Sequence, residues 1–291
     1  MTTIGEALAQ GRRVLASSMQ SDIDRARLDA QVLLSYVLGV DRVYLYTYPE
    51  RELAAREEQQ YRELIDRRAQ HEPVAYLTGT KEFYGREFIV DQRVLIPRPE
   101  TELLVEAALE QVRLHLYVDR LPLVADIGTG SGAIPVTIAL EEPQLPYLYA
   151  CDVSPDALEV ARLNCERYHV EQRLRLLHGD LLAPLPEPVD ILIANLPYVG
   201  TNEESFLAHD VLNYEPHQAL FSGPDGLELL RRFCQEVQES AKVKPGAVVL
   251  LEIGYQQREP LIRLLQALLP QSRITTQRDY AGWDRILQIA L

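Results

Sequence analysis

Four consecutive residues, Asn195, Leu196, Pro197 and Tyr198, carry the groups needed to hold a planar amino group. They follow the apolar run 189–194, which predicts a buried parallel strand, so they lie at a strand's carboxyl end, where open α/β sheets place ligands. The Asn195 side-chain carbonyl and the Leu196 backbone carbonyl can accept two N–H bonds. Pro197 fixes the backbone, and Tyr198 offers a flat ring for stacking. Taken alone, the pattern fits a strand end followed by a turn equally well.

A glycine-rich turn lies between an earlier predicted strand and the helix after it. Its glycines permit a tight turn and a close backbone approach to a ligand, and the helix N-terminus adds partial positive charge. Gly128, Gly130 and Ala133 satisfy the dinucleotide fingerprint G-x-G-x-x-A, although such turns also occur without a ligand. The candidate cofactor-binding residues here are Asp126, Gly128, Thr129, Gly130, Ser131 and Gly132.

Two further predicted strands end in carboxylates. Asp152 can accept both hydroxyls of a ribose, which NAD and S-adenosylmethionine share, so it does not separate these cofactors. Alternatively it caps the next helix, for which Ser154 is the better cap. Asp180 can accept from an adenine amine while Leu181 packs on the ring, or it is a turn aspartate.

The elements that position these residues alternate along the chain from residue 122. This alternation predicts a mostly parallel sheet covered on both faces. The last two strands are too close in sequence for a helical crossover, so they should pair antiparallel. We predict strands at 122–127, 147–152, 174–178, 189–194, 246–253, 272–278 and 285–291, and helices at 132–141, 155–168, 225–241 and 257–269.

The residues before this sheet divide into three parts. Residues 1–72 predict helices over about 4–15, 22–38 and 50–70, with Asp41 capping a short turn. This helical domain either docks a partner or only shields the larger domain. Residues 73–91 predict a linker with a β-hairpin, in which 73–79 breaks the helical pattern. Residues 92–291 form the larger domain, which opens with a Pro-rich segment and a helix at 100–116.

Composition narrows the classes of function. The net charge is -14, of which residues 1–72 contribute -2 and the remainder -12, whereas a surface that follows a phosphate backbone is usually basic. No apolar run approaches the ~18 residues of a membrane span, and no signal peptide is evident. Three scattered cysteines fit reduced thiols in the cytoplasm, and six histidines without metal-ligand spacing give no metal site.

Residues 126–130, Asp152 and 195–198 together resemble the class I S-adenosylmethionine-dependent N-methyltransferases. Three further stretches are similar to the HemK/PrmC family: 73–79, 95–101 and 214–227, the last containing Tyr214-Glu215-Pro216 and Gly223-Pro224-Asp225-Gly226-Leu227. The family motif is usually Asn-Pro-Pro-Tyr, and Leu196 replaces its first proline. The backbone carbonyl survives this change, while an extra N–H and some backbone freedom are introduced.

The resemblance implies an α/β, Rossmann-like fold with a seven-stranded sheet and a small N-terminal helical domain. It implies that S-adenosylmethionine methylates the side-chain nitrogen (N5) of the glutamine in the Gly-Gly-Gln motif of peptide chain release factors. Asn195, Leu196, Pro197 and Tyr198 would be the catalytic residues, Asn195 would also contact the cofactor, and the helical domain would recognise the release factor. No metal, direct nucleic-acid partner or membrane is expected, and the enzyme would be cytoplasmic.

Three alternatives remain at this point. The same grip would suit a nucleic-acid amino-methyltransferase acting on adenine N6, cytosine N4 or guanine N2. Leu196 could mark a cofactor-binding module without catalysis, and a nicotinamide-dependent oxidoreductase would use the same glycine turn. The roles of Arg98 and Glu100, beside the expected cofactor, and of Glu252, at the end of the fifth strand, stay open.

Overall fold

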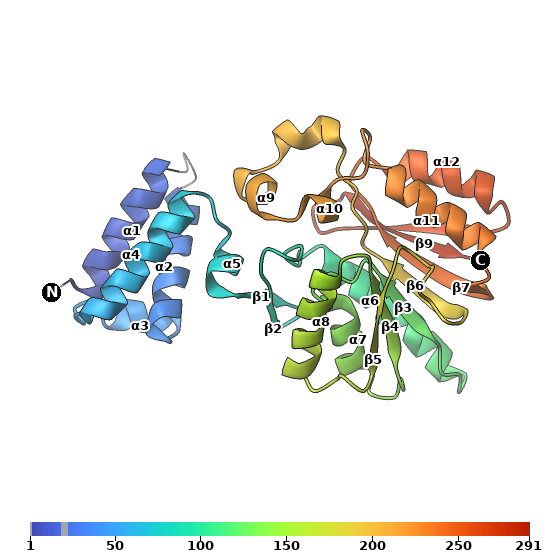
Figure 1. Ribbon diagram of the computed structural model, residues 1–291, viewed down its shortest axis with the longest axis horizontal. Coiled ribbons are helices and arrows are strands. Elements are labelled where there is room, and N and C mark those ends of the chain that lie inside the picture. The colour runs from blue at the N-terminus through green and yellow to red at the C-terminus, as the bar shows by residue number, and fades with distance from the viewer. Residues whose placement is uncertain (1, 19–22) are drawn as a thin grey trace. The chain divides into compact units, whose positions relative to one another are not determined.

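The computed structural model describes residues 2–18 and 23–291 (Figure 1). The chain forms two compact units. One, here called the N-terminal unit, comprises Met1–Thr80 and Ala208–Tyr214; the other, the sheet unit, comprises Lys81–Leu207 and Glu215–Leu291. Each is described by itself below.

The N-terminal unit is helical, as predicted. Its helices are α1 (Ile4–Ser18), α2 (Ile23–Leu38), α3 (Arg42–Thr47), α4 (Ala55–Ala69), α5 (Val74–Thr78) and α9 (His209–Tyr214). Asp41 caps α3, because its carboxylate accepts from the Tyr44 N–H at 2.8 Å. The expected helix start at residue 22 lies outside the described residues.

Two local expectations in this unit were wrong. Helix α4 begins at Ala55 rather than residue 50, because the backbone before it pairs with the start of the chain: Ile4 N–H donates to the Arg51 carbonyl and Leu53 N–H to the Thr2 carbonyl, each at 2.9 Å. Residues 74–78, expected to break the helical pattern, form the short helix α5. It ends at Gly79, whose φ of 73° suits glycine.

A buried arginine holds the helices of the N-terminal unit together. Arg68 of α4 is 1% exposed; its Nε donates to the Asp29 carboxylate of α2 at 2.7 Å and its Nη1 to the Glu72 carbonyl at 3.1 Å. Asp210 of α9 lies 3.8 Å from the same guanidinium and 2.6 Å from that of Arg25. These ion pairs join α9, which comes from late in the sequence, to α2 and α4.

The sheet unit contains a seven-stranded sheet in the order β5-β4-β3-β6-β7-β9-β8. The first five of these pair parallel, and β9 pairs antiparallel with both β7 and β8, as predicted. The strands are β3 (Val124–Ile127), β4 (Leu148–Asp152), β5 (Leu174–His178), β6 (Val189–Ala194), β7 (Val243–Glu252), β8 (Arg273–Arg278) and β9 (Asp284–Ala290).

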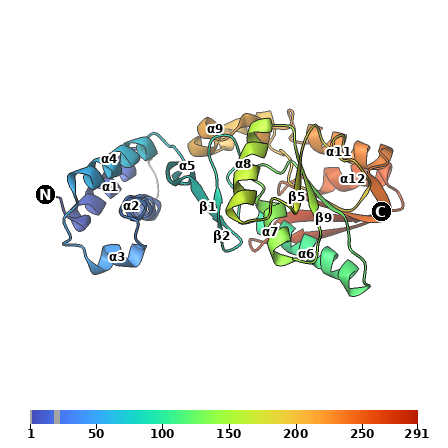
Figure 2. The same ribbon diagram turned by 60° about the horizontal axis from the view of Figure 1, so that its bottom comes forward.

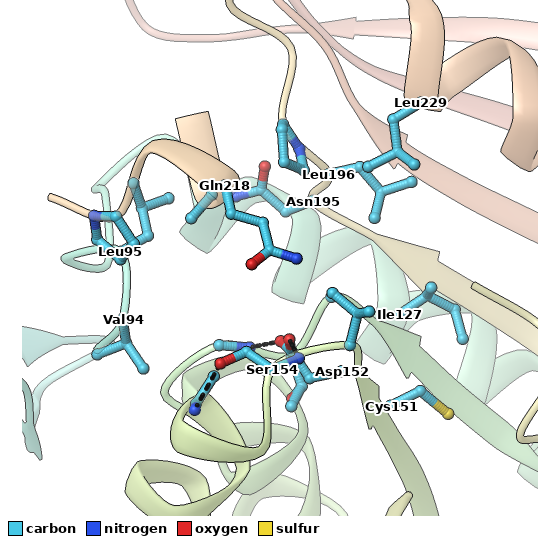
Figure 3. Close-up of a pocket in the computed structure, with 18 of the residues that line it drawn as sticks. Val94, Leu95, Ile127, Cys151, Asp152, Ser154, Asn195, Leu196, Gln218 and Leu229 are labelled. Atoms are coloured by element: carbon cyan, nitrogen blue, oxygen red, sulfur yellow. Dashed lines mark hydrogen bonds between the residues drawn. The ribbon is translucent and has the colours of Figure 1, made fainter. Parts of the chain in front are cut away.

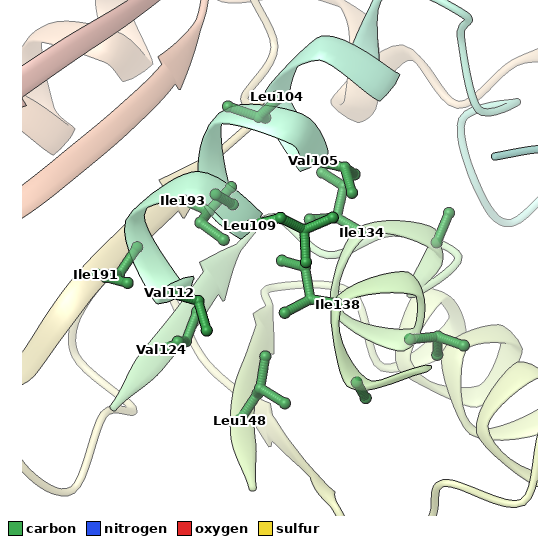
Figure 4. Close-up of a cluster of buried hydrophobic side chains, with 14 of the residues drawn as sticks. Leu104, Val105, Leu109, Val112, Val124, Ile134, Ile138, Leu148, Ile191 and Ile193 are labelled. Atoms are coloured by element: carbon green, nitrogen blue, oxygen red, sulfur yellow. The ribbon is translucent and has the colours of Figure 1, made fainter. Parts of the chain in front are cut away.

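Helices cover both faces of this sheet (Figure 1 and Figure 2). On one face lie α6 (Thr101–Tyr117), α7 (Ala133–Glu141) and α8 (Pro155–Arg167); on the other lie α11 (Glu228–Glu239) and α12 (Arg258–Leu268). Successive strand residues alternate between the faces, so Val124, Ile191 and Ile193 pack against α6 (Figure 4) while their neighbours pack toward α11. Because both faces are buried, the central strands are mostly apolar, which is why the sequence revealed them.

A β-hairpin, β1 (Thr80–Phe83) and β2 (Arg86–Ile89), packs beside α8. The turn between the strands places Tyr84 and Gly85 at φ values of 53° and 70°. The Asn164 side chain of α8 bonds both backbone groups of Ile89, at 2.7 and 2.9 Å. Phe83 and Phe88 enter the core under α6, so the predicted hairpin exists and is anchored to the sheet unit.

The segment between β6 and α11 contains short helices that the sequence did not indicate. They are the 3₁₀ helix η1 (Thr201–Phe206), α9 and α10 (His217–Leu220). Within the described residues, no helix is long and apolar enough to span a membrane.

Candidate active site

A cavity of about 540 Å³ lies at the carboxyl ends of β3, β4 and β6 (Figure 3). Its volume is within the range of small-molecule sites. The structure brings together residues predicted from four separate parts of the sequence. Those that line the cavity are Gly128, Thr129, Gly130, Ser131, Asp152, Asp180, Leu181, Asn195, Leu196 and Pro197. Asp126, Gly132 and Tyr198 lie outside this lining.

The glycine turn is folded tightly against its neighbours. The N–H groups of Gly128 and Thr129 both donate to the Cys151 carbonyl at 2.9 Å, which ties the turn to the end of β4. Gly128 has a φ of 75°, and a Cβ there would lie 3.0 Å from the Leu196 side chain. A side chain at this position would therefore be strained and would press on the residue that replaces the usual proline.

Asp152 is oriented by backbone donors. One oxygen accepts from Gly130 N–H at 2.8 Å and the other from Ser154 N–H at 2.9 Å (Figure 3). Burial raises the pKa of this carboxyl, and these bonds oppose the effect. Each oxygen retains a second lone pair that can accept from a ligand hydroxyl. Ser154 caps α8, as predicted, accepting from Ala157 N–H at 3.2 Å.

Asp126 lies at the second-last position of β3 and is 1% exposed. Neither of its oxygens accepts a hydrogen bond from a described residue, although the Thr129 hydroxyl lies near enough to lower its pKa. Burial raises the pKa of this carboxyl to about 7, and the nearby Asp152 charge adds to the effect. A buried carboxylate without a partner is costly, so a cationic ligand near the glycine turn would relieve it.

The far side of the cavity carries an ion pair. Asp180 follows β5 and pairs with Arg232 of α11, and both side chains line the cavity. Leu181 is buried and has a φ of 43°. The predicted contacts of Asp180 and Leu181 with an adenine stay a prediction, since the carboxylate already has a protein partner here.

Asn195 follows β6 directly, and its side chain is held by another residue that lines the cavity. Its Nδ2 donates to the hydroxyl of Thr101, the first residue of α6, at 3.1 Å. With the NH₂ group so engaged, the carbonyl oxygen is the end of the amide left to accept from a ligand. Leu196 is buried, and Pro197 lines the cavity beside it.

Tyr198 lies behind the cavity wall. Its hydroxyl donates to Glu252 at the end of β7 at 3.4 Å, and burial raises the pKa of Tyr198. Its carbonyl accepts from the Gln257 side chain at 2.7 Å. A Cβ on Gly226 would lie 2.2 Å from that carbonyl, so the glycine is required for this close approach. The predicted stacking of the ring on a substrate stays a prediction.

Two features at the cavity, an ion pair and a glutamine, were not among the predicted site residues. Glu215 is buried and accepts from Ile96 N–H at 3.0 Å. It also forms an ion pair at 2.5 Å with Arg98, and Arg98 lines the cavity. Gln218 of α10 extends into the cavity between Asn195 and Asp152 (Figure 3). The Glu-Pro and Pro-Arg-Pro stretches were the sequence signal for Arg98 and Glu215; Gln218 had none.

A metal site is not indicated: the described residues contain no cluster of three or more His, Cys, Asp or Glu side chains that could hold an ion.

Comparisons with known protein families match both units. Residues 6–79 match the family described as PrmC N-terminal domain, and residues 101–224 match the family described as methyltransferase small domain. Solved structures share the fold: a human methyltransferase 10 domain containing protein, 17% identical, superposes with a TM-score of 0.51 over 71% of this chain and 88% of that one. The catalytic domain of hMettl16 gives 0.53 at 17% identity, over 75% and 79%. These likenesses establish the class I methyltransferase fold.

Relatives of higher identity span nearly the whole chain. A release factor glutamine methyltransferase of Koribacter versatilis is 42% identical, over 84% of this chain and 85% of the relative. One of Bacillus cereus is 37% identical, over 94% and 95%. The chain belongs to the release factor glutamine methyltransferase family.

Proposed function

We propose that this chain transfers a methyl group from S-adenosylmethionine to the side-chain nitrogen (N5) of the glutamine in the Gly-Gly-Gln motif of peptide chain release factors. Family membership supports the reaction. The observation that carries it is the Asn195 side chain, whose NH₂ group is bound by Thr101 and whose carbonyl remains to accept an N–H from a substrate amide at the cavity.

The residues of the cavity fit S-adenosylmethionine. Asp152 would accept the ribose hydroxyls, and Asp180 and Leu181 would hold the adenine. The unpartnered Asp126 carboxylate suits a molecule that carries a sulfonium and an ammonium group. When bound, the cofactor supplies an electrophilic methyl group, and no metal is needed because the departing thioether is neutral.

The protein's part in the chemistry is to orient a poor nucleophile. An amide nitrogen shares its lone pair with its carbonyl, so it reacts only when it is held in line with the methyl group. Asn195 Oδ1 and the Leu196 carbonyl would accept its two N–H bonds, with Pro197 keeping that backbone in place. Orientation of this kind contributes up to ~7–11 kcal/mol.

Other parts of the chain have separate tasks in this proposal. The helical region 1–72 would recognise a release-factor surface away from the glutamine, 73–91 would serve as the linker, and 92–291 would form the catalytic domain. The net charge of -12 beyond residue 72 favours a protein substrate over direct contact with nucleic acid. The reaction would take place in the cytoplasm.

Labelled S-adenosylmethionine and a purified bacterial release factor test the proposal. The matched control is the same factor with the Gly-Gly-Gln glutamine replaced by alanine. We expect label on the first and none on the second. Label on neither, with the cofactor still bound by calorimetry, would contradict the proposed acceptor; label on both would move the acceptor to another residue.

A further inference from the structure

A series of buried polar groups extends from Asn195 through Thr101, which also lines the cavity. The Asn195 NH₂ group donates to the Thr101 hydroxyl at 3.1 Å, and Thr101 is 4% exposed. The Thr101 hydroxyl lies near enough to the carboxylate of Glu252 to lower its pKa; this carboxylate is 1% exposed, and its Oε2 accepts no hydrogen bond from the described residues. Glu252 also accepts from the Tyr198 hydroxyl at 3.4 Å. The two polar side chains of the proposed substrate grip, Asn195 and Tyr198, thus meet at one buried carboxylate.

The number of protons on these groups decides which group donates in each hydrogen bond of the series. An ionised carboxylate only accepts, so wherever the hydroxyl of Thr101 or Tyr198 bonds Glu252, the hydroxyl is the donor. The single proton of Thr101 is then used, and its oxygen is left to accept from a neighbour. Asn195 can satisfy it only with its NH₂ group, which leaves the amide carbonyl for the cavity. With a neutral group at position 252, the Thr101 proton is free to point at the Asn195 carbonyl instead.

We propose that Thr101 and Glu252 are positioning residues for methyl transfer: the Glu252 carboxylate sets the direction of the Thr101 hydrogen bond, which keeps the carbonyl of Asn195 facing the substrate amide. A reversed Asn195 would present a donor to a substrate NH₂ group and lose one of the two acceptors. This inference deepens the proposed function and rests on it, because it assigns the means by which the grip is held.

The surroundings of Glu252 give the proposal a pH signature. Burial raises its pKa to about 7, while the Thr101 and Tyr198 hydroxyls and the Arg285 guanidinium of β9 lower it and the Glu100 charge raises it. A raised pKa means that the carboxyl gains its proton as the pH falls below about 7. Protonated Glu252 no longer fixes the direction of the Thr101 hydrogen bond. We therefore expect kcat to fall toward acid pH, while the affinity for S-adenosylmethionine changes little.

The first test compares Thr101→Val with Thr101→Ser. Valine keeps the shape and removes the hydroxyl, so we expect kcat to fall about 10–100-fold through misplacement of the grip, with the Kd for S-adenosylmethionine unchanged within about threefold. Serine restores the hydroxyl and should restore kcat. The matched control is Thr137→Val in α7, a buried threonine whose hydroxyl bonds the Ala133 carbonyl; its kcat should equal that of the unmodified chain.

The second test is independent of activity. The side-chain NH₂ signal of Asn195 in an NMR spectrum, assigned by its loss in Asn195→Ala, should be protected from hydrogen exchange in the unmodified chain and in Thr101→Ser, and unprotected in Thr101→Val. Glu252→Gln should abolish the decrease of kcat below pH 7. Equal exchange and equal kcat in both Thr101 variants would overturn the inference, even if methyl transfer itself is demonstrated. If no acceptor is methylated, the NMR comparison still decides it.

Discussion

Buried carboxylates at the amino ends and at the carboxyl ends of the parallel strands, here called the amino edge and the carboxyl edge of the sheet, differ in their hydrogen-bond partners. Asp190 lies at the amino end of β6 and is 2% exposed; it accepts from Leu123 N–H at 2.9 Å and Lys244 at 2.7 Å and pairs with Arg120. Asp126, at the carboxyl end of the neighbouring strand β3, is 1% exposed and accepts no hydrogen bond from the described residues, with the Thr129 hydroxyl as its nearby polar neighbour. The same residue type is thus neutralised at one edge and left unsatisfied at the other.

The pKa values of Asp190 and Asp126 are shifted in opposite directions. Burial acts to raise the pKa of both carboxyls, but the Lys244, Leu123 and Arg120 interactions lower the pKa of Asp190 overall, whereas that of Asp126 is raised to about 7. A paired buried charge contributes to stability when its partners remain, and an unpaired one subtracts from it. The buried carboxylate at the carboxyl ends of the strands, on the side of the cavity, therefore lowers stability, and the one at the amino ends does not.

The largest effect should come from the carboxyl edge. Asn195→Ala removes the proposed acceptor of a substrate N–H without touching the glycine turn, so turnover should fall about 100–1000-fold, as for the loss of one oriented polar contact. The affinity for S-adenosylmethionine should stay nearly the same. A titration and a rate assay on one preparation check this, and an equal loss of binding and turnover would remove Asn195 from its proposed role.

The amino edge should respond in stability instead. Asp190→Ala removes the acceptor of a backbone N–H and of two cations, and we expect the free energy of unfolding to fall by about 2–3 kcal/mol at pH 7. Because the folded pKa is lowered, this loss should shrink as the pH falls below about 4 and the carboxyl takes up its proton. Urea unfolding measures it.

A change in cofactor affinity on mutation of Asp190 would contradict the comparison. If Asp190→Ala lowered the affinity for S-adenosylmethionine while leaving the free energy of unfolding unchanged, Asp190 would be a binding residue. The two edges would then not differ as we describe.

The smallest effect, and the one of opposite sign, should come from Asp126→Asn. The neutral amide avoids the cost of the unpaired charge but keeps an unbonded polar group, so we expect a gain of about 1 kcal/mol in unfolding free energy at pH 8. The folded pKa of Asp126 is raised, so the unmodified chain loses stability as the pH rises from about 4 to 7, and the gain should vanish near pH 4.

Affinity for the cofactor supplies the second half of this test. If Asp126 serves a cationic ligand, Asp126→Asn should bind S-adenosylmethionine more weakly although it is the more stable protein. A variant that is less stable at pH 8 than at pH 4, relative to the unmodified chain, would show that Asp126 is satisfied in solution.

The sheet could be predicted because each of its central strands has a recognisable local sequence pattern. Central strands buried on both faces are apolar runs, and glycines, prolines and aspartates at their ends give the boundaries. Strand β7 begins at Val243, before the predicted residue 246, because Val243 pairs with Val189 across the sheet. Such pairing is a property of the fold, and the local pattern of Lys244-Pro245-Gly246 gives no sign of it.

The site was predictable to the same extent. Residues at strand ends line the cavity as expected, since parallel strands bring their carboxyl ends to one edge. The placement of Tyr198 was not, because it depends on Glu252 and Gly226, which lie far away in sequence. Helix α9 was missed for a similar reason: six residues carry no clear period, and ion pairs of Asp210 with Arg25 and Arg68 hold them.

The late arrival of α9 has a consequence for the order of folding during synthesis. A ribosome delivers residues 81–207 between α5 and α9, and at about 5–20 residues per second this takes roughly 6–25 s. During that interval α1, α2 and α4 have emerged, and Arg68 has Asp29 but not Asp210. The N-terminal unit, although first to leave the ribosome, is therefore completed only after most of the sheet has been made.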